Sequence, residues 1–174
     1  MLKMFTTQLT GLYTRIMNKE EESFEDGARL LAQAAVGSGK IYLKGFGEMA
    51  GIHHEALHGA EPLPHAAVLE TVEALSDADR VILFTRFSDD APAVELAEKL
   101  TAQGVPFTAV SGRKRETEGK CLTELADVFI DTHLVKPMLP GEDLERIGFP
   151  SLMAALYIYH VLKFTLTEIL AEYE

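Results

Sequence analysis

The sequence predicts an α/β fold: an open parallel sheet with helices on both of its faces. The clearest observation is a strand–helix–strand unit, in which two runs of branched and aromatic residues, 80–85 and 105–110, flank an amphipathic segment. Parallel strands so connected require a right-handed helical crossover. Three more strands are predicted by short apolar runs at residues 41–44, 66–69 and 128–130. Alternating strands and helices of this kind are typical of a layered sheet.

Two helices are expected before the first strand. The first is predicted by apolar side chains at spacings of three and four, namely Leu2, Phe5, Leu9, Leu12 and Ile16. The second is expected to begin after an acidic cluster at residues 20–22, at about Ser23. It should end at Gly37 and Gly39, because glycine tolerates the left-handed geometry of a helix C-terminus.

The remaining helices are predicted from their start and stop signals. A helix from about Met49 to His58 should end before Gly59 and two prolines. One or two turns are expected within residues 71–76. The crossover helix should open at Asp89 or Asp90, because Asp is a good cap and Pro92 fits the first turn, and Gly104 should end it.

The C-terminal third is expected to hold a short helix, a strand, a loop and one long helix. The short helix covers residues 122–126, and the loop covers residues 137–150. The closing helix, residues 151–172, is apolar nearly all round, which is typical of a helix that is central or lies in a subunit interface.

Length and composition indicate one cytoplasmic domain. At roughly 150 residues a domain, 174 residues predict a single unit, with leading helices at 1–36, an α/β core at 40–131 and the closing helix. The net charge of −11 and the lack of a strong basic stripe argue against nucleic-acid binding. The single cysteine fits a reducing compartment. We find neither a signal peptide nor a run of about 18 or more uncharged apolar residues, which a membrane span requires; residues 149–162 come nearest.

One histidine-rich segment carries a candidate metal or catalytic site. His54-Glu55-Ala56-Leu57-His58 has the HExxH form, in which two histidines share a helix face and hold zinc while the glutamate acts as a base. The helix is short, and His65 misses the third ligand position of a metzincin by one, so a zinc protease is disfavoured. Another metal or catalytic use of this segment and a plain surface role both stay open.

The ends of three predicted strands carry candidate anion ligands. Gly45 and Gly47 follow the first strand and open a helix, so their amides are candidates for an anion site, with a tight turn as the alternative. The other candidates are Thr85, Arg86 and Ser88 after one strand and Ser111, beside the basic triplet 113–115, after the next. In open α/β sheets, ligands bind at this edge. The neighbouring Asp89 and Asp90 oppose an anion, and helix capping explains them equally well.

Taken together, these segments resemble a SIS (sugar isomerase) domain, and most closely its phosphoheptose isomerase branch. The resemblance covers nearly the whole chain and is carried by the leading helices, residues 41–47, the 81–111 unit, the phrase Leu125-Ala126-Asp127-Val128 and the closing helix. It implies a five-stranded, flavodoxin-like sheet of order 2-1-3-4-5. It also implies a homodimer or homotetramer, and a phosphorylated sugar bound at the carboxyl edge of the sheet.

The chain departs from the family's pattern at several site positions. In the loop Gly-x-Gly-x-Ser, Met49 replaces the serine and Glu48 precedes it. In the phosphate loop Ser-x-Ser-Gly-x-Thr, Thr85 matches the first serine, but the last three named positions are held by Phe87, Ser88 and Asp90. Leu152 stands where the last helix of the family has a glutamine.

The resemblance also assigns catalytic roles. The phosphoheptose branch carries a histidine and a glutamate four residues apart after the first loop, and this chain offers His54 and His58 one position early as ligands for a divalent metal such as zinc. Glu55 and Glu61 are candidates for the missing base, and we assign Glu55. His160 matches the catalytic histidine of the last helix, although a packing role is its ordinary reading. We expect aldose–ketose isomerisation of a phosphosugar, or, as the alternative, a non-catalytic sugar-phosphate sensor.

Overall fold

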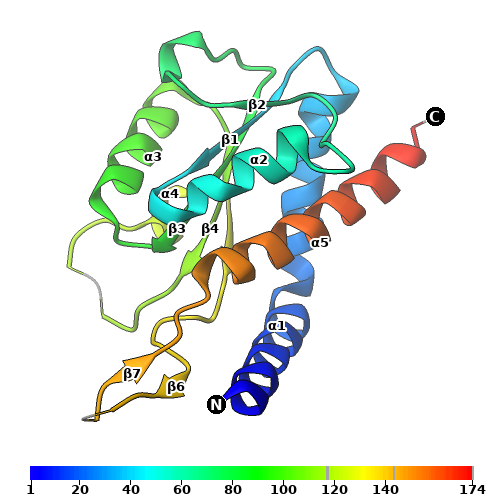
Figure 1. Cartoon of the computed structure of the whole chain (residues 1–174). Helices are drawn as coiled ribbons and strands as arrows, with labels where there is room; N and C mark the ends of the chain where they lie inside the picture. The colour runs from blue at the N-terminus through cyan, green and yellow to red at the C-terminus, as the bar shows by residue number, and fades with distance from the viewer. Residues whose placement is uncertain (117, 143, 174) are drawn as a thin grey trace.

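Five parallel strands in the order β2-β1-β3-β4-β5 form the sheet of the computed structural model, which describes residues 1–116, 118–142 and 144–173 (Figure 1). Every neighbouring pair is parallel. In chain order the strands are β1 (Ile41–Gly45), β2 (Ala66–Val68), β3 (Arg80–Phe87), β4 (Phe107–Gly112) and β5 (Val128–Asp131). The predicted fold class, strands and strand order are confirmed.

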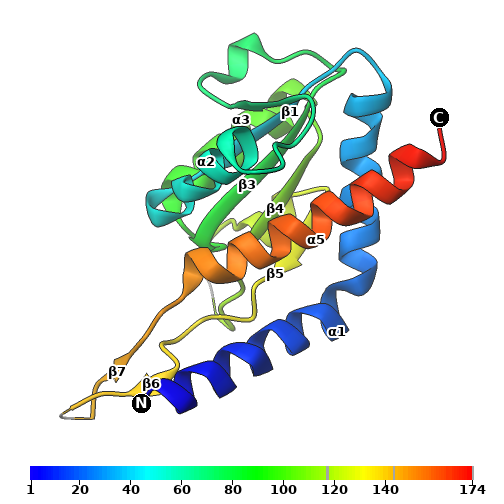
Figure 2. The same cartoon turned by 45° about the vertical axis from the view of Figure 1, so that its right-hand side comes forward.

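Helices cover both faces of this sheet. One face carries α1 (Leu2–Val36), α2 (Gly51–His58) and α5 (Ser151–Ala171), and a 3-10 helix, η1 (Gly47–Ala50), leads into α2. The other face carries η2 (Val72–Ala74), α3 (Ala91–Gln103) and α4 (Leu122–Leu125). Figure 2 shows α5 crossing α1 on the first face.

Alternate residues of the central strands feed the two halves of the core. In β3, Ile82 and Phe84 pack under α1, α2 and α5, whereas Val81 and Leu83 pack under α3 and α4. All four are at most 1% exposed. A strand that is buried on both faces needs apolar residues at successive positions. For this reason the sequence pattern of residues 80–85 predicts a strand.

The two predicted leading helices are one continuous helix, α1. The prediction of a break at residues 20–22 was wrong because no glycine or proline interrupts the chain there, and glutamate is a good helix former. Glu20 is not a solvated surface acid but is buried, and its carboxylate is bonded to His133. The contact between Glu20 and His133 therefore explains the acidic residue at which the sequence predicted the end of a helix.

Two further boundaries differ from prediction. β4 begins at Phe107 and not at Val105, because the Val105 amide still donates to the Leu100 carbonyl at the end of α3. The predicted loop at 137–150 contains a short antiparallel pair, β6 (Leu139–Pro140) and β7 (Arg146–Ile147), where Leu139 is buried.

The closing helix is confirmed as α5. It is the one described helix that is long and apolar enough to cross a membrane, but 44% of its most apolar window is buried inside the protein. Its inner face, which includes Ala154, Ala155 and Ile158, is fully buried against the rest of the core. Burial on this scale is what the central helix of a layered domain requires, so the apolar composition has an explanation without a membrane.

Candidate functional site

The parallel sheet brings the predicted anion-binding loops to one edge. Gly45, Phe87 and Gly112 end three adjacent strands, and backbone hydrogen bonds tie the loops that follow them together. The Phe46 amide donates to the Phe84 carbonyl at 2.9 Å, and the Ser88 amide donates to the Gly112 carbonyl at 3.1 Å. The carboxyl edge of the sheet therefore forms one connected surface, as the order of the strands predicts.

Gly45 allows the chain to turn sharply from β1 into η1. A Cβ at this position would lie 2.3 Å from the Met49 carbonyl oxygen, so only glycine fits. Its amide donates to Nε2 of His53 at 2.9 Å, which ties the first turn of α2 to the end of β1. Burial, together with the charges of Lys44 and His54, lowers the pKa of His53. His53 thus serves a structural role, since its Nε2 accepts the Gly45 hydrogen bond.

Glu48 and Arg86 form a two-pronged ion pair across the edge. Arg86 Nε and Nη2 donate to the Glu48 carboxylate at 2.8 and 2.7 Å, and the Ser151 hydroxyl donates to the same carboxylate. The hydrogen bond from Arg86 is the largest reason that the pKa of Glu48 falls to about 2, and the Ser151 bond adds to it. Loops after β1 and β3 are thus joined to the start of α5.

In the β3–α3 loop, the Asp90 carboxylate lies at the hydrogen-bond donors that were predicted to bind an anion. The Asp90 carboxylate accepts a hydrogen bond from the Thr85 hydroxyl and a longer one, 3.4 Å, from the Phe87 amide. Asp90 stands at the N-cap of α3, but its side chain makes no cap hydrogen bond to the helix. Asp89 instead pairs with Lys114 at 2.9 Å. An internal acid therefore occupies donors that suit a phosphate.

A pocket of about 290 Å³ lies beside these two groups, and we call it the carboxyl-edge pocket. It is lined by Phe46, Gly47, Glu48, Arg86, Asp90, Ala91 and Pro92. Of the predicted ligand-binding residues, Gly47, Glu48 and Arg86 therefore reach it. Gly45, Thr85, Ser88 and Ser111 are buried behind the surface, and the hydroxyls of Ser88 and Ser111 have no hydrogen-bond partner among the described residues.

The predicted catalytic residues, Glu55 on α2 and His160 on α5, lie together. Glu55 Oε1 is 3.6 Å from His160 Nε2, and the two side chains are 38% and 40% exposed, so a ligand can reach both. Tyr159 is buried beside them; burial, and secondly the charge of Glu55, raises its pKa to about 12. His160 is thus not a buried packing histidine. The pair does not line the carboxyl-edge pocket.

The predicted metal ligands are neighbours without a third donor. The rings of His54 and His58 lie 6.1 Å apart at a tilt of 44° on the exposed side of α2. Within the ranges that the structure describes, no three His, Cys, Asp or Glu side chains are grouped to hold a metal ion. A catalytic zinc site needs three protein ligands. These residues do not form such a set, and we derive no step through a metal.

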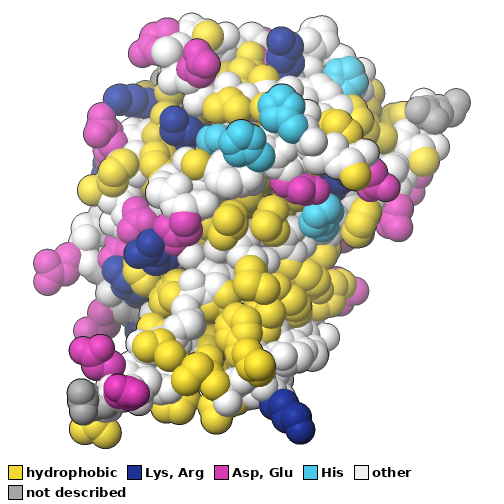
Figure 3. Space-filling model, in the orientation of Figure 1, with side chains coloured by type: hydrophobic (Ala, Val, Ile, Leu, Met, Phe, Trp, Pro, Cys, Tyr) yellow, Lys and Arg dark blue, Asp and Glu magenta, His cyan; other side chains and the backbone are white. Residues whose placement is uncertain are grey.

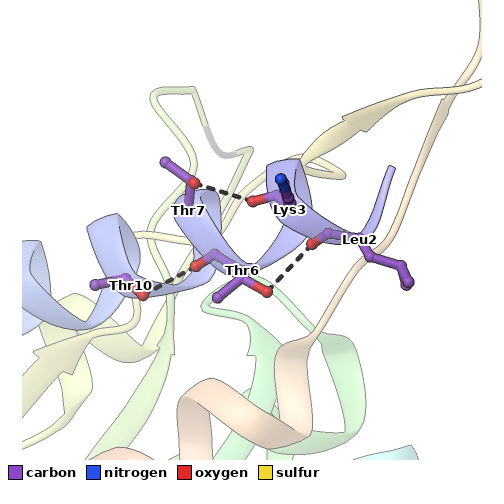
Figure 4. Close-up of a pocket in the computed structure, with 5 residues that line it drawn as sticks. All are labelled: Leu2, Lys3, Thr6, Thr7 and Thr10. Atoms are coloured by element: carbon purple, nitrogen blue, oxygen red, sulfur yellow. Dashed lines mark hydrogen bonds between the residues drawn. The ribbon is translucent and has the colours of Figure 1, made fainter.

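A larger pocket elsewhere on the protein offers fewer polar groups that are free to bind a ligand. Figure 4 shows this pocket, lined by Leu2, Lys3, Thr6, Thr7 and Thr10 of α1. Its threonine hydroxyls donate to carbonyl oxygens four residues earlier in the same helix, for example Thr6 to Leu2 at 3.1 Å. Donors bonded in this way are not directed at a ligand. The carboxyl edge is therefore the better candidate site.

Replacing Arg86 with glutamine is expected to raise the pKa of Glu48 from about 2 toward its ordinary value of 4.5. The pKa is lowered in the fold, so the pair stabilises the protein above pH 4.5, and this stability is lost as the pH falls toward 2. Both side chains are partly exposed, so the loss should not exceed about 1 kcal/mol. NMR titration of the Glu48 carboxyl carbon measures the shift, and an unchanged pKa in Arg86→Gln contradicts the assignment.

Sequence comparison places the chain in a family. The profile of DUF2529, described as a domain of unknown function, matches residues 1–170. The chain belongs to the DUF2529 family. It is 47% identical over 174 residues to the "Uncharacterized protein YwjG" of Bacillus subtilis (strain 168), with 99% of each chain covered.

Comparison with solved structures shows that the chain shares its fold with sugar isomerase domains. NanR of Vibrio vulnificus, solved with ManNAc-6P, superposes with a TM-score of 0.70 at 15% identity, covering 99% of this chain and 64% of that one. The sugar isomerase domain of an RpiR transcription factor from Sphaerobacter thermophilus gives 0.59 at 12% identity, over 98% and 97% of the chains. A phosphoheptose isomerase of Francisella tularensis gives 0.62 at 14% identity, over 94% of each. The predicted resemblance to the SIS domain is thus confirmed for the fold.

Proposed function

We propose that this protein binds a phosphorylated sugar at the carboxyl edge of its sheet and interconverts its aldose and ketose forms. The Glu55–His160 pair carries the proposal. A carboxylate and an imidazole, 3.6 Å apart and both open to solvent, are the two groups that such a reaction needs. The SIS fold supports the choice of ligand, since one structural neighbour was solved with ManNAc-6P and another is a phosphoheptose isomerase. The phosphoheptose type of sugar is our specific proposal.

Each member of the pair has a defined task in this proposal. Glu55 removes the proton from the carbon next to the sugar carbonyl, which gives an enediolate, and then returns that proton to the former carbonyl carbon. His160 moves a proton between the two sugar oxygens. Tyr159 holds a neutral phenol beside them, because its pKa is far above physiological pH. Gly47, Glu48 and Arg86 hold the rest of the ligand, with Gly45, Thr85, Ser88 and Ser111 behind them.

A specific observation favours the alternative, a non-catalytic sensor of sugar phosphates. Glu48 neutralises Arg86, and Asp90 already accepts the hydrogen bond of Thr85. A phosphate must displace these carboxylates, which lowers its affinity. A binding protein that has lost isomerase activity would show the same departures from the family pattern in the loop after β3.

The two proposals are separated by one pair of assays on the wild-type protein. Turnover of sedoheptulose 7-phosphate is followed by NMR, and melting temperature is measured with and without that sugar. Conversion of the ketose supports the isomerase. A higher melting temperature without conversion supports the sensor, because a ligand that binds the native state stabilises it. If millimolar sugar gives neither conversion nor a higher melting temperature, both proposals are contradicted.

Replacing Asp90 with asparagine is expected to tighten sugar-phosphate binding. The change removes one negative charge next to the bound phosphate and keeps nearly the same side-chain size, and no cap hydrogen bond to α3 is lost because the Asp90 side chain makes none. We expect the dissociation constant to fall about tenfold, as measured by calorimetry. Glu95→Gln removes the same charge from an exposed, lysine-paired position on α3 and should leave binding unchanged. Equal or weaker binding by Asp90→Asn would show that Asp90 does not compete with phosphate.

We also propose that the protein is a cytoplasmic homodimer or homotetramer. Figure 3 shows apolar side chains gathered on the face where α1 and α5 lie. Large apolar residues of these helices remain exposed in a single chain, among them Met4 (46%), Met17 (39%), Met153 (42%) and Phe164 (56%). Contiguous exposed apolar surface is typical of a protein interface. Light scattering of the purified protein measures the mass, and a value of 19.2 kDa would contradict the proposal.

A further inference from the structure

A second polar pocket lies outside the candidate site, and we call it the α1–β7 pocket. It has a volume of about 230 Å³ and lies between the first half of α1, residues 133–138 after β5, and Arg146 of β7. Figures 1 and 2 both place the N-terminal end of α1 beside the β6–β7 pair. It shares no lining residue with the carboxyl-edge pocket. A ligand here would therefore occupy a place separate from the carboxyl-edge pocket.

The α1–β7 pocket is basic in an acidic protein. Arg15, Lys136 and Arg146 line it together with Gln8 and His133, and none of its lining residues is acidic. The whole chain has 27 acidic and 16 basic residues. Within the described part of the chain, neither Arg15 nor Lys136 forms an ion pair or a side-chain hydrogen bond. Their charges are therefore available to a ligand.

The fold holds one wall of the pocket in place. Nε and Nη2 of Arg146 donate to the carbonyls of Pro137 and Met138 at 2.8 and 2.7 Å, which orients the guanidinium and leaves Nη1 unused by these bonds. His133 has a left-handed backbone (φ 52°), its amide donates to Asp131 at 2.8 Å, and its Nε2 donates to Glu20 at 2.7 Å. Glu20 and Asp131 therefore face the imidazole. A wall held by such bonds is preorganised for binding.

We propose that the α1–β7 pocket binds a small phosphate monoester. Guanidinium groups match the oxygens of phosphate and carboxylate, and lysine adds a point charge. Three cations exceed the single charge of a carboxylate and suit the double charge of a phosphate. The volume is below the range typical of drug-sized ligands, so it suits a phosphate with a small organic group.

Inorganic phosphate is the probe for this proposal. Melting temperature and calorimetric heat are measured with phosphate against sodium chloride of equal ionic strength. The wild type should show a phosphate-specific response. The double variant Arg15→Gln/Lys136→Gln should weaken phosphate binding about tenfold or more, because it removes two charge-assisted contacts. Both residues are exposed, so the variant should fold, and circular dichroism without phosphate checks this.

The matched control is Lys99→Gln/Lys120→Gln. It removes the same charge from two exposed lysines outside the pocket, each paired with a glutamate, and should keep the wild-type response. No phosphate-specific response in the wild type overturns the proposal, and so does a response that Arg15→Gln/Lys136→Gln retains. If Arg86→Gln abolishes that retained response, the anion binds at the carboxyl edge. That result supports the proposed function while it overturns this inference.

Discussion

Replacing Glu55 with glutamine is expected to slow conversion of sedoheptulose 7-phosphate by about 10²–10⁴-fold, because the proton next to the carbonyl then has no base. Glutamine has nearly the same size and keeps a hydrogen-bonding group 3.6 Å from His160, so the helices should stay packed. The Michaelis constant should change little, since Glu55 does not line the carboxyl-edge pocket. Steady-state kinetics followed by NMR measures both quantities.

Glu61→Gln is the matched control, because Glu61 was the other candidate base in the sequence. Its side chain is 76% exposed, and it interacts with Lys163 instead of His160. We expect its turnover to remain within a factor of about two, as is usual for a group outside the reacting centre. An unchanged rate in Glu55→Gln ends the assignment of the base, and a large loss in Glu61→Gln transfers the role to that residue.

Replacing Gly45 with alanine is expected to destabilise the protein by about 3 kcal/mol, the largest stability effect that we predict. The new Cβ would meet backbone atoms of Met49 and Ala50 at 2.3 to 2.6 Å, and a backbone cannot move aside as a flexible side chain does. The turn from β1 into η1 would open, and with it the carboxyl-edge pocket. Urea unfolding measures the change in free energy.

Gly11→Ala provides the control in the opposite direction. Gly11 lies within α1, is exposed, and a Cβ there would meet nothing within 4 Å. Alanine has a higher helix propensity, so this variant should be more stable than the wild type by about 0.5–1 kcal/mol. If Gly45→Ala unfolds at the same urea concentration as the wild type, Gly45 does not approach the Met49 backbone as closely as the structure shows.

The fold could be predicted because its main signals are local. Residues 80–112 combine two strands buried on both faces with a helix that lies between Asp90 and Gly104, and the φ of Gly104, 69°, favours glycine. The continuity of α1 could not be predicted in this way. Glu20 looks like a surface acid until the fold brings His133, 113 residues later, within 2.7 Å.

The candidate site could be predicted only as a set of positions. Parallel strands bring their carboxyl ends to one edge, so the loops after β1, β3 and β4 were expected to meet there. The pairings inside the site depend on packing between distant elements. Ser151 reaches Glu48 across 103 residues, and Glu55 meets His160 only because α5 lies against α2. The hydrogen bond from Thr85 to Asp90 also depends on the conformation of the loop, which cannot be predicted from the residue types alone.

A crystal structure of the protein with bound sedoheptulose 7-phosphate tests the central claim most directly. We expect a sugar whose phosphate lies beside Gly47 and Arg86, with the Asp90 carboxylate displaced from Thr85 and the sugar carbonyl end next to Glu55 and His160. A sugar phosphate that occupies only the α1–β7 pocket, while Asp90 stays bonded to Thr85, would contradict it.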